Sequence, residues 1–347
     1  MKSPLLPNNE YNLVKEMFQG ADAIRDFDLD RAFEFARPFV AAYGSGTYSR
    51  ILFTGEGSSR IFPAKRALYE NNKGAKALPL FTEGSTQALE YDLSKTLVSG
   101  ASNSGRTKEL IRLFRTLKDQ GHQGLFGITA SEGSLLGELS SAFVLGCGGE
   151  KAVAATKSVL EQALVVQFLV HLLNGGSKNE FQTFLAPGAK AVEAALTQEV
   201  PPTMVDSLAK AGKIYFAGRN NGVAEELALK TNEITRKDSA YLEGTIAVHG
   251  IEEIMNPGDA LVIIDPFAQE EETFQTYLEK GVGVSILAIS DRKTLFPTLH
   301  IPKADKMDEY AQLAAGWNLL LKAGISLGID VDTPTRARKV GNEFVGS

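Results

Sequence analysis

The sequence predicts an α/β protein with two domains, each built on a five-stranded parallel sheet flanked by helices. The length of 347 residues corresponds to roughly two domains. Short β-rich runs alternate with amphipathic helical stretches, and these runs are almost continuously apolar, as is typical of strands buried on both faces. With 44% hydrophobic and 22% charged residues, the composition is that of a folded globular chain.

The N-terminal segment 1–48 is predicted to be helical and peripheral. Residues 11–18 and 29–43 carry apolar side chains at helical spacing. We expect both stretches to pack over the part of the chain that follows them.

The first predicted domain covers residues 49–180. Its candidate strands are 50–55, 77–81, 97–102, 124–129 and 142–147, with helices such as 108–120 between them. A long apolar helix over 158–173 is followed by the polar stretch 174–180, which we expect to connect the two domains.

The second predicted domain covers residues 181–330 and repeats the alternation. Its candidate strands are 213–218, 239–244, 260–265, 284–289 and 299–302, followed by a terminal helix over 308–327 and a tail over 331–347. In both halves the first strand ends in a glycine-bearing turn that leads into a helix, which indicates an internal duplication.

Charge and cysteine content narrow the range of partners. The chain has 36 basic and 42 acidic residues, a net charge of −6, and no dense basic block, which disfavours a nucleic-acid partner. Its single cysteine, Cys147, can form neither an intramolecular disulfide nor a zinc knuckle. No apolar segment resembles a signal peptide or a membrane span. We therefore expect a cytoplasmic protein without a membrane partner.

Two loops are candidates for binding a small anion. Ser102, Ser104 and Thr107 lie between a predicted strand and a predicted helix, where hydroxyls and free N–H groups can cradle an anion. The same residue types also suit a plain N-capping turn. Because the glycine-rich loop 55–59 also follows a strand, at the edge where open α/β sheets bind ligands, the two loops together favour the anion site.

Neither loop matches a dinucleotide or ATP fingerprint. The run GEGSSR lacks the third glycine of G-x-G-x-x-G, and no P-loop motif occurs. The single cysteine and the scattered histidines offer no cluster of metal ligands; the histidines are His122, His171, His249 and His300. We therefore expect a protein that uses no cofactor.

Four short motifs in a fixed order resemble the sugar isomerase (SIS) family: GEGSS, SNSGRT, AVAATKS at 152–158 and EELALKTNEI at 225–234. The resemblance covers residues 45–345 and implies two SIS domains, each a three-layer αβα, flavodoxin-like unit. The same tandem occurs in the isomerase half of glucosamine-6-phosphate synthase and in stand-alone sugar-phosphate isomerases, deaminases and deglycases. The resemblance thus implies a phosphosugar enzyme that forms a homodimer or a higher homo-oligomer.

The resemblance also implies roles for individual residues in substrate binding. The anion loop would hold the substrate phosphate, the first loop would add two hydroxyls, and the third motif would line the sugar. The residues are Ser102, Asn103, Ser104 and Thr107 for the anion loop, Ser58 and Ser59 for the first loop, and Ala154 and Thr156 for the third motif.

Four further residues match the family's catalytic positions. Glu233 would shuttle a proton between C1 and C2 of the open-chain sugar, and Lys230 lies one turn earlier on the same helix face. His249 would open the sugar ring, reaching the site from the partner subunit, and Lys339 would lie near the sugar carbonyl in a tail that closes over the active site. This chemistry needs one carboxylate, a group that titrates near neutrality and a cation.

Two charged residues depart from the family pattern. Arg106 stands where relatives often carry Glu, and its positive charge beside the anion loop favours an anionic substrate. Glu56, inside the first loop, would repel a phosphate unless Arg60, Lys65 or Arg106 neutralises it. The substrate's anionic group therefore stays open.

We expect an aldose–ketose isomerase of a sugar phosphate, either an amino sugar or a ketose 6-phosphate, that works through an enediol. Deamination and deglycation use similar machinery, so both stay open as coupled reactions. The alternative from another class is a non-catalytic regulatory protein that binds a sugar phosphate. The sequence names neither the sugar nor the pathway.

Overall fold

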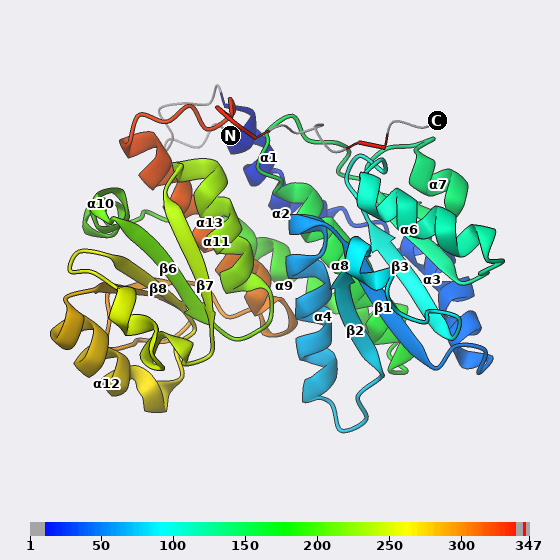
Figure 1. Cartoon of the computed structure of the whole chain (residues 1–347), viewed down its shortest axis with the longest axis horizontal. Coiled ribbons are helices and arrows are strands. Elements are labelled where there is room, and N and C mark those ends of the chain that lie inside the picture. The colour runs from blue at the N-terminus through cyan, green and yellow to red at the C-terminus, as the bar shows by residue number, and fades with distance from the viewer. Residues whose placement is uncertain (1–10, 338–342, 345–347) are drawn as a thin grey trace. The chain divides into compact units, whose positions relative to one another are not determined.

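Two five-stranded parallel sheets organise the chain in a computed structural model that describes residues 11–337, Glu343 and Phe344 (Figure 1). Each sheet anchors one compact unit. The first-sheet unit contains Asp22–Lys151, Ala155–Ala186 and the described end of the tail. The second-sheet unit contains Pro187–Thr335, Ala152–Ala154 and the first helix, α1 (Asn12–Phe18).

The first sheet has the strand order β2-β1-β3-β4-β5, with every neighbouring pair parallel. Its strands are β1 (Arg50–Gly55), β2 (Leu80–Gly84), β3 (Thr96–Ala101), β4 (Leu125–Thr129) and β5 (Ser141–Val144). Strands β3 and β4 are buried along their whole length because helices cover both faces of the sheet.

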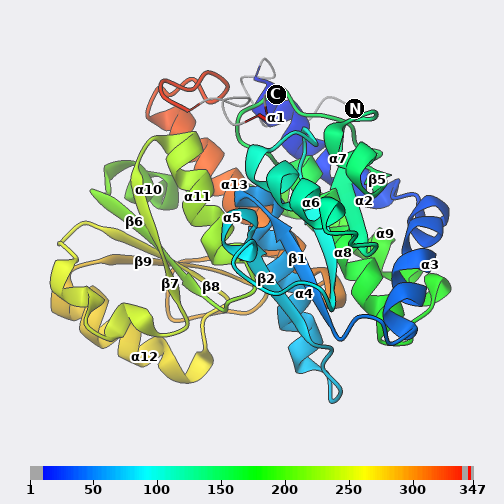
Figure 2. The same ribbon diagram turned by 45° about the vertical axis from the view of Figure 1, so that its right-hand side comes forward.

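Two layers of helices cover the first sheet (Figures 1 and 2). One layer holds α3 (Leu29–Gly44), α4 (Ile61–Lys73) and α8 (Lys157–Leu173), and the other holds α5 (Ser85–Ala88), α6 (Lys108–Asp119) and α7 (Leu135–Leu139). Phe39 of α3 packs edge-to-face on Phe126 of β4 with 4.9 Å between ring centroids. On the opposite face, Val98 of β3 packs with Leu110 and Phe114 of α6.

The second sheet has the order β10-β9-β8-β6-β7 and is also entirely parallel. Its strands are β6 (Lys213–Gly218), β7 (Asp238–Glu243), β8 (Ala260–Ile264), β9 (Ser285–Ser290) and β10 (Thr298–His300). On one face pack α10 (Pro202–Lys210), α11 (Val223–Thr235) and α13 (Asp308–Ser326); on the other lie α12 (Glu271–Phe274) and the short turns η2 (Ile246–Val248) and η3 (Ile251–Ile254).

Both sheets therefore have the same order when their strands are numbered along the chain: second, first, third, fourth, fifth. The chain reverses its direction across the sheet between the first and third strands of each unit. Ligands of open α/β sheets bind at the carboxyl ends of the strands at this point. In the first-sheet unit the two candidate anion loops leave β1 and β3, which flank that point.

The ten predicted strands are all present, with small shifts. The largest shift is in β2, predicted at 77–81 and found at Leu80–Gly84. Pro79 has no N–H to donate to a ladder, and its carbonyl accepts the Ile51 N–H at 3.0 Å, so the strand starts only after it.

The region between the two units also differs from the expectation. A connector was expected over 174–180, but α9 (Lys178–Thr197) begins within it, and the compact units divide at Pro187 inside this helix. At the N-terminus, α1 packs on α13 of the second-sheet unit, and α2 (Gly20–Arg25) follows it. None of the described helices is long and apolar enough to cross a membrane.

Candidate functional site

The loop after β3 folds into a compact turn made by its own hydroxyls. The Oγ atoms of Ser102 and Thr107 lie 2.7 Å apart, and Ser102 Oγ also accepts the Gly105 N–H at 3.0 Å. Ser104 Oγ accepts the Arg106 N–H at 3.2 Å. Thr107 is the N-cap of α6, so the loop leads into the first N–H groups of a twelve-residue helix, which have no partner within the helix.

Gly105 is required for this turn for two reasons. Its φ of 63° lies in the left-handed region, and a Cβ at this position would lie 2.3 Å from Ser134 Oγ. The sequence predicted Ser102, Ser104 and Thr107 as a cluster of hydroxyls, and the structure brings these three residues together with Asn103. Whether the cluster binds a phosphate stays a prediction.

The first loop leaves the neighbouring strand. Ser58 and Ser59 lie in a single 3-10 turn, η1 (Gly57–Ser59), directly after β1. Gly55 pairs in register with Ala101 of β3, and a Cβ on Gly55 would lie 2.7 Å from the Ala101 carbonyl oxygen. Because this approach is so close, both loops start side by side at the carboxyl edge of the first sheet.

Glu56 has a local partner that the sequence did not suggest. Its Oε1 accepts the backbone N–H of Ser85 at 2.9 Å, at the start of α5. Arg60, Lys65 and Arg106 were the neutralising groups considered from sequence. A backbone donor at a helix start stabilises this carboxylate and fixes its direction.

The third motif is organised by a buried carboxylate that the sequence did not single out. Glu150 Oε1 accepts both the backbone N–H of Thr156, at 2.7 Å, and its hydroxyl, at 3.1 Å. The Ser158 hydroxyl donates to the other carboxylate oxygen. Thr156 occupies the N-cap position of α8 in the first-sheet unit, although its hydroxyl donates to Glu150 and accepts no amide of the helix, whereas Ala154 belongs to the second-sheet unit.

The second-sheet unit holds a buried cluster of charges on α11. Lys230 is completely buried, and its Nζ lies 2.7 Å from Glu233 Oε2 and 3.3 Å from Glu226 Oε1. These three residues share one face because helical neighbours are three and four positions apart. Glu226 is also fully buried, whereas 23% of the Glu233 side chain is exposed, so Glu233 is the member of the cluster open to solvent.

The charge state of Lys230 follows from this cluster. Burial alone lowers the pKa of a lysine, but the carboxylates of Glu233 and Glu226 outweigh it and raise the pKa of Lys230 above its ordinary value. Lys230 is therefore a permanent cation near neutral pH. The sequence indicated Lys230 and Glu233 but missed Glu226, whose four-residue spacing from Lys230 was the available signal.

His249 forms its hydrogen bonds with residues outside the cluster of Lys230, Glu226 and Glu233. It follows the turn η2 and is exposed; its backbone N–H donates to the Ile246 carbonyl at 3.0 Å, and its ring Nε2 lies 3.2 Å from Thr245 Oγ1. Lys339 lies outside the described residues. The structure thus joins Lys230 with Glu233 and leaves the predicted roles of His249 and Lys339 untested.

Two described residues near the C-terminus contact the anion loop. Glu343 forms an antiparallel bridge with Thr107, and the Phe344 N–H donates to the Arg106 carbonyl at 2.8 Å. The Phe344 ring packs against the apolar cluster under α6, and the Arg115 guanidinium lies 4.2 Å from its centroid. This end of the tail therefore rests on the predicted phosphate loop.

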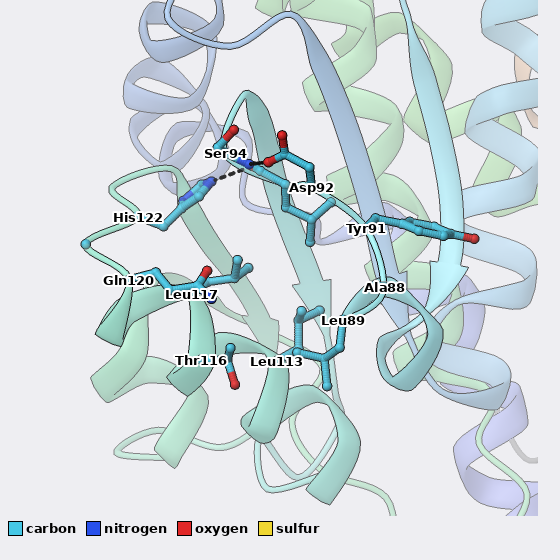
Figure 3. A pocket seen from close by; sticks show the side chains of 12 residues that line it. Ala88, Leu89, Tyr91, Asp92, Ser94, Leu113, Thr116, Leu117, Gln120 and His122 are labelled. Atoms are coloured by element: carbon cyan, nitrogen blue, oxygen red, sulfur yellow. Dashed lines mark hydrogen bonds between the residues drawn. The ribbon is translucent and has the colours of Figure 1, made fainter.

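A pocket of about 360 Å³ lies elsewhere in the first-sheet unit, at the amino ends of β3 and β4 (Figure 3). Leu93, Leu113 and Leu117 contribute apolar lining. Two of its polar side chains have internal partners: His122 Nε2 lies 3.0 Å from the Thr96 carbonyl, and Asp92 accepts the Ser94 N–H. This pocket is at the opposite sheet edge from the anion loops. Among the described residues, no group of three His, Cys, Asp or Glu side chains is arranged to hold a metal.

Comparison with known proteins places this geometry in context. No family model matches the chain. A glutamine–fructose-6-phosphate aminotransferase (isomerizing) of Sulfolobus acidocaldarius is 23% identical over 94% of this chain and 56% of its own length. The enzyme of the same name from Aeropyrum pernix is 28% identical over 71% of this chain and 43% of its own length. The chain thus spans about half the length of these curated relatives.

Solved structures share the fold over nearly the whole chain. The C-terminal domain of glucosamine-fructose-6-phosphate aminotransferase from Francisella tularensis superposes with a TM-score of 0.76 at 20% identity, covering 94% of this chain and 99% of that domain. Tagatose-6-phosphate ketose/aldose isomerase from Escherichia coli gives 0.77 at 16% identity, covering 94% and 98%. Glucosamine-6-phosphate deaminase from Thermotoga maritima gives 0.69 at 20% identity, covering 95% and 99%. The resemblance to the sugar isomerase (SIS) family is confirmed, since the curated relatives carry isomerizing activity in their names and the chain shares its fold with phosphosugar isomerases and a deaminase.

Proposed function

We propose that the chain is a phosphosugar isomerase or deaminase that interconverts an aldose and a ketose 6-phosphate without a cofactor. The observation that carries this proposal is the ion-paired Glu233, a partly exposed carboxylate held by a buried lysine. A sensor of sugar phosphates needs an anion loop but has no use for such a proton carrier.

The phosphate would bind at the loop Ser102–Thr107. Hydroxyls of Ser102, Ser104 and Thr107, together with the first amides of α6, offer donors to phosphate oxygens. Arg106 adds a positive charge. Glu56 accepts a hydrogen bond from the Ser85 N–H, so it does not take one of the donors that would bind the phosphate. This supports binding of a dianion by a chain whose net charge is −6.

Glu233 would then carry the proton. Starting from a ketose, its carboxylate removes a proton from C1 while O2 gains one, which gives the cis-enediol. Return of the carried proton to C2, with loss of the O1 proton, gives the aldose. The Lys230 ammonium holds the Glu233 carboxylate in place, with 2.7 Å between Nζ and Oε2, and Lys339 would offset negative charge on O2. His249 would open the sugar ring, supplied by the second subunit of a homodimer.

The decisive test is Glu233→Gln, which keeps the size of the side chain but removes the base. Turnover should fall by about 10²–10⁴-fold, and solvent deuterium should no longer enter C1 or C2 of the bound sugar, while phosphosugar binding persists. Glu225→Gln, on the same helix, is the matched control and should retain turnover. Full activity in Glu233→Gln would overturn the assignment.

The substrate class is decided by a panel of hexose, hexosamine and fructosamine 6-phosphates, scored for isomerisation and for ammonia release. Turnover with ammonia release would assign deamination, and release of a free amine would assign deglycation. Stabilisation of the wild-type chain against thermal unfolding without turnover or deuterium exchange on any of them would instead favour the non-catalytic regulatory protein.

A further inference from the structure

The C-cap of α11 is occupied by a residue that rarely takes its conformation. Arg236 has φ 57° and ψ 14°, in the left-handed region where helices usually end with glycine. A non-glycine residue persists there when its surroundings hold it in place. The helix it ends is the one that carries Glu233.

The Arg236 guanidinium binds three backbone carbonyls. Nη1 donates to the carbonyl of Glu233, and Nη2 donates to the carbonyls of Asp330, at 2.9 Å, and Thr333, at 2.8 Å. One side chain therefore connects the last turn of α11 with residues 330–333, where the tail begins. A planar guanidinium with several fixed donors suits this task better than an ammonium group.

The segment 330–333, which we call the tail root, has two further attachments within the same unit. Asp332 accepts the backbone N–H groups of Asn12, at 2.5 Å, and Leu13, at 2.8 Å, and so caps α1. Val331 is 2% exposed. It lies beside Gly324, where an added Cβ would be 2.8 Å from the Ile234 carbonyl and 3.4 Å from Val331 Cγ1.

We propose that Arg236 is a positioning residue that fixes the tail root to the turn of α11 bearing Glu233. The same guanidinium binds the backbone carbonyl of Glu233, so it also holds the last turn of the helix that carries the proposed base. The link to catalysis rests on the proposed function, whereas the anchoring of the root does not.

The first experiment measures anchoring alone. Arg336 is exposed just beyond the tail root and offers a trypsin site. In Arg236→Gly both hydrogen bonds from the guanidinium to the tail root are lost. At a low trypsin concentration, where the tail root opens and closes faster than it is cut, cleavage after Arg336 should accelerate at least tenfold. Hydrogen exchange at the Asn12 and Leu13 amides should rise as well.

Two variants separate anchoring from general damage. Arg236→Gly places the preferred residue at a left-handed position, so the urea midpoint of the whole chain should not fall. Lys237→Ala removes a neighbouring donor that binds the Ala211 carbonyl at 2.6 Å, and its cleavage rate should stay within about twofold of wild type. Unchanged cleavage after Arg336 in Arg236→Gly would overturn the proposal.

The second experiment tests the link to catalysis. Arg236→Gly should lower kcat about tenfold with little change in KM, because the turn that bears the Glu233 carboxylate loses its anchor. Adding it to Glu233→Gln should cost no further activity, since both substitutions act through that carboxylate. Fully additive losses would show that Arg236 does not work through Glu233. If the wild-type chain has no isomerase activity, the proposed function fails while the proteolysis result still decides the anchoring.

Discussion

A lysine with its whole side chain buried keeps its charge only where carboxylates surround it. Lys230 meets this condition through Glu226 and Glu233. Removing one member of such a cluster lowers the stability of the fold more than replacing the whole cluster with apolar residues, since the remaining charges stay buried without a partner. The three residues should therefore behave as one unit in mutagenesis.

Replacing Lys230 with methionine should destabilise the second-sheet unit by about 3–5 kcal/mol, because two carboxylates would then face each other without their cation. Adding Glu226→Gln should recover part of this loss. Urea unfolding of the three proteins measures both effects. A double variant less stable than Lys230→Met would contradict the charge explanation.

The raised pKa of Lys230 also sets the pH range of this stabilisation. For a base whose folded pKa lies above the unfolded value of about 10.4, the contribution is complete below that value and is lost as pH rises through the folded pKa. The stability gap between wild type and Lys230→Met should therefore narrow only above about pH 10.4. Thermal unfolding at closely spaced alkaline pH values tests this, and a gap that has already closed at pH 9 would rule it out.

At the scale of single elements, the anion loop depends on Gly105, which has a left-handed backbone conformation and leaves no room for a Cβ. Gly105→Ala places a Cβ 2.3 Å from Ser134 Oγ, so the loop must move. Affinity for inorganic phosphate or a sugar 6-phosphate, measured calorimetrically, should fall at least tenfold, because the hydroxyls of Ser102 and Thr107 lose their alignment.

The chain supplies a matched control for this substitution. Gly133 has the same φ of 63°, but no atom lies within 4 Å of an added Cβ. Gly133→Ala thus carries the same left-handed strain, roughly 1 kcal/mol, without the collision. If both variants lost affinity equally, backbone strain and not the contact with Ser134 would be responsible.

Local patterning predicted the elements well and the contacts between them less well. The apolar runs predicted the bounds of β1 and β6 correctly, because a strand covered on both faces is apolar along its whole length and its ends are easy to recognise. The partners of Glu56 and Glu150 could not be predicted in this way. Glu56 meets Ser85 only after β2 pairs with β1, and Glu150 meets Thr156 only through the path of an irregular loop.

For the whole molecule, the repeated strand order of the two sheets agrees with the internal duplication indicated by the sequence. The order of the motifs along the chain was sufficient to indicate the family, because the motifs lie in both halves of the sequence. Motif order did not give the limits of the compact units, since the chain passes between them within α9, a helix that continues through Pro187 and Gly188.

A homodimer that shares His249 across subunits makes a quantitative prediction. Glu233→Gln and His249→Ala chains should each be inactive, but after mixing and subunit exchange the heterodimers should carry one intact site each. Activity should recover to about one quarter of wild type. Light scattering shows whether the dimer exists, and no recovery in a mixture of exchanged dimers would mean that each site is built from one chain.

The hydroxyl pair of Ser102 and Thr107 has a consequence for selectivity. At 2.7 Å one of the two hydroxyls donates to the other, so a ligand that takes hydrogen bonds from both must break this existing bond. A phosphate dianion, with several strong acceptor oxygens, makes that exchange favourable, whereas the hydroxyl of an unphosphorylated sugar does not. We therefore expect the resting loop itself to favour phosphorylated sugars over unphosphorylated ones.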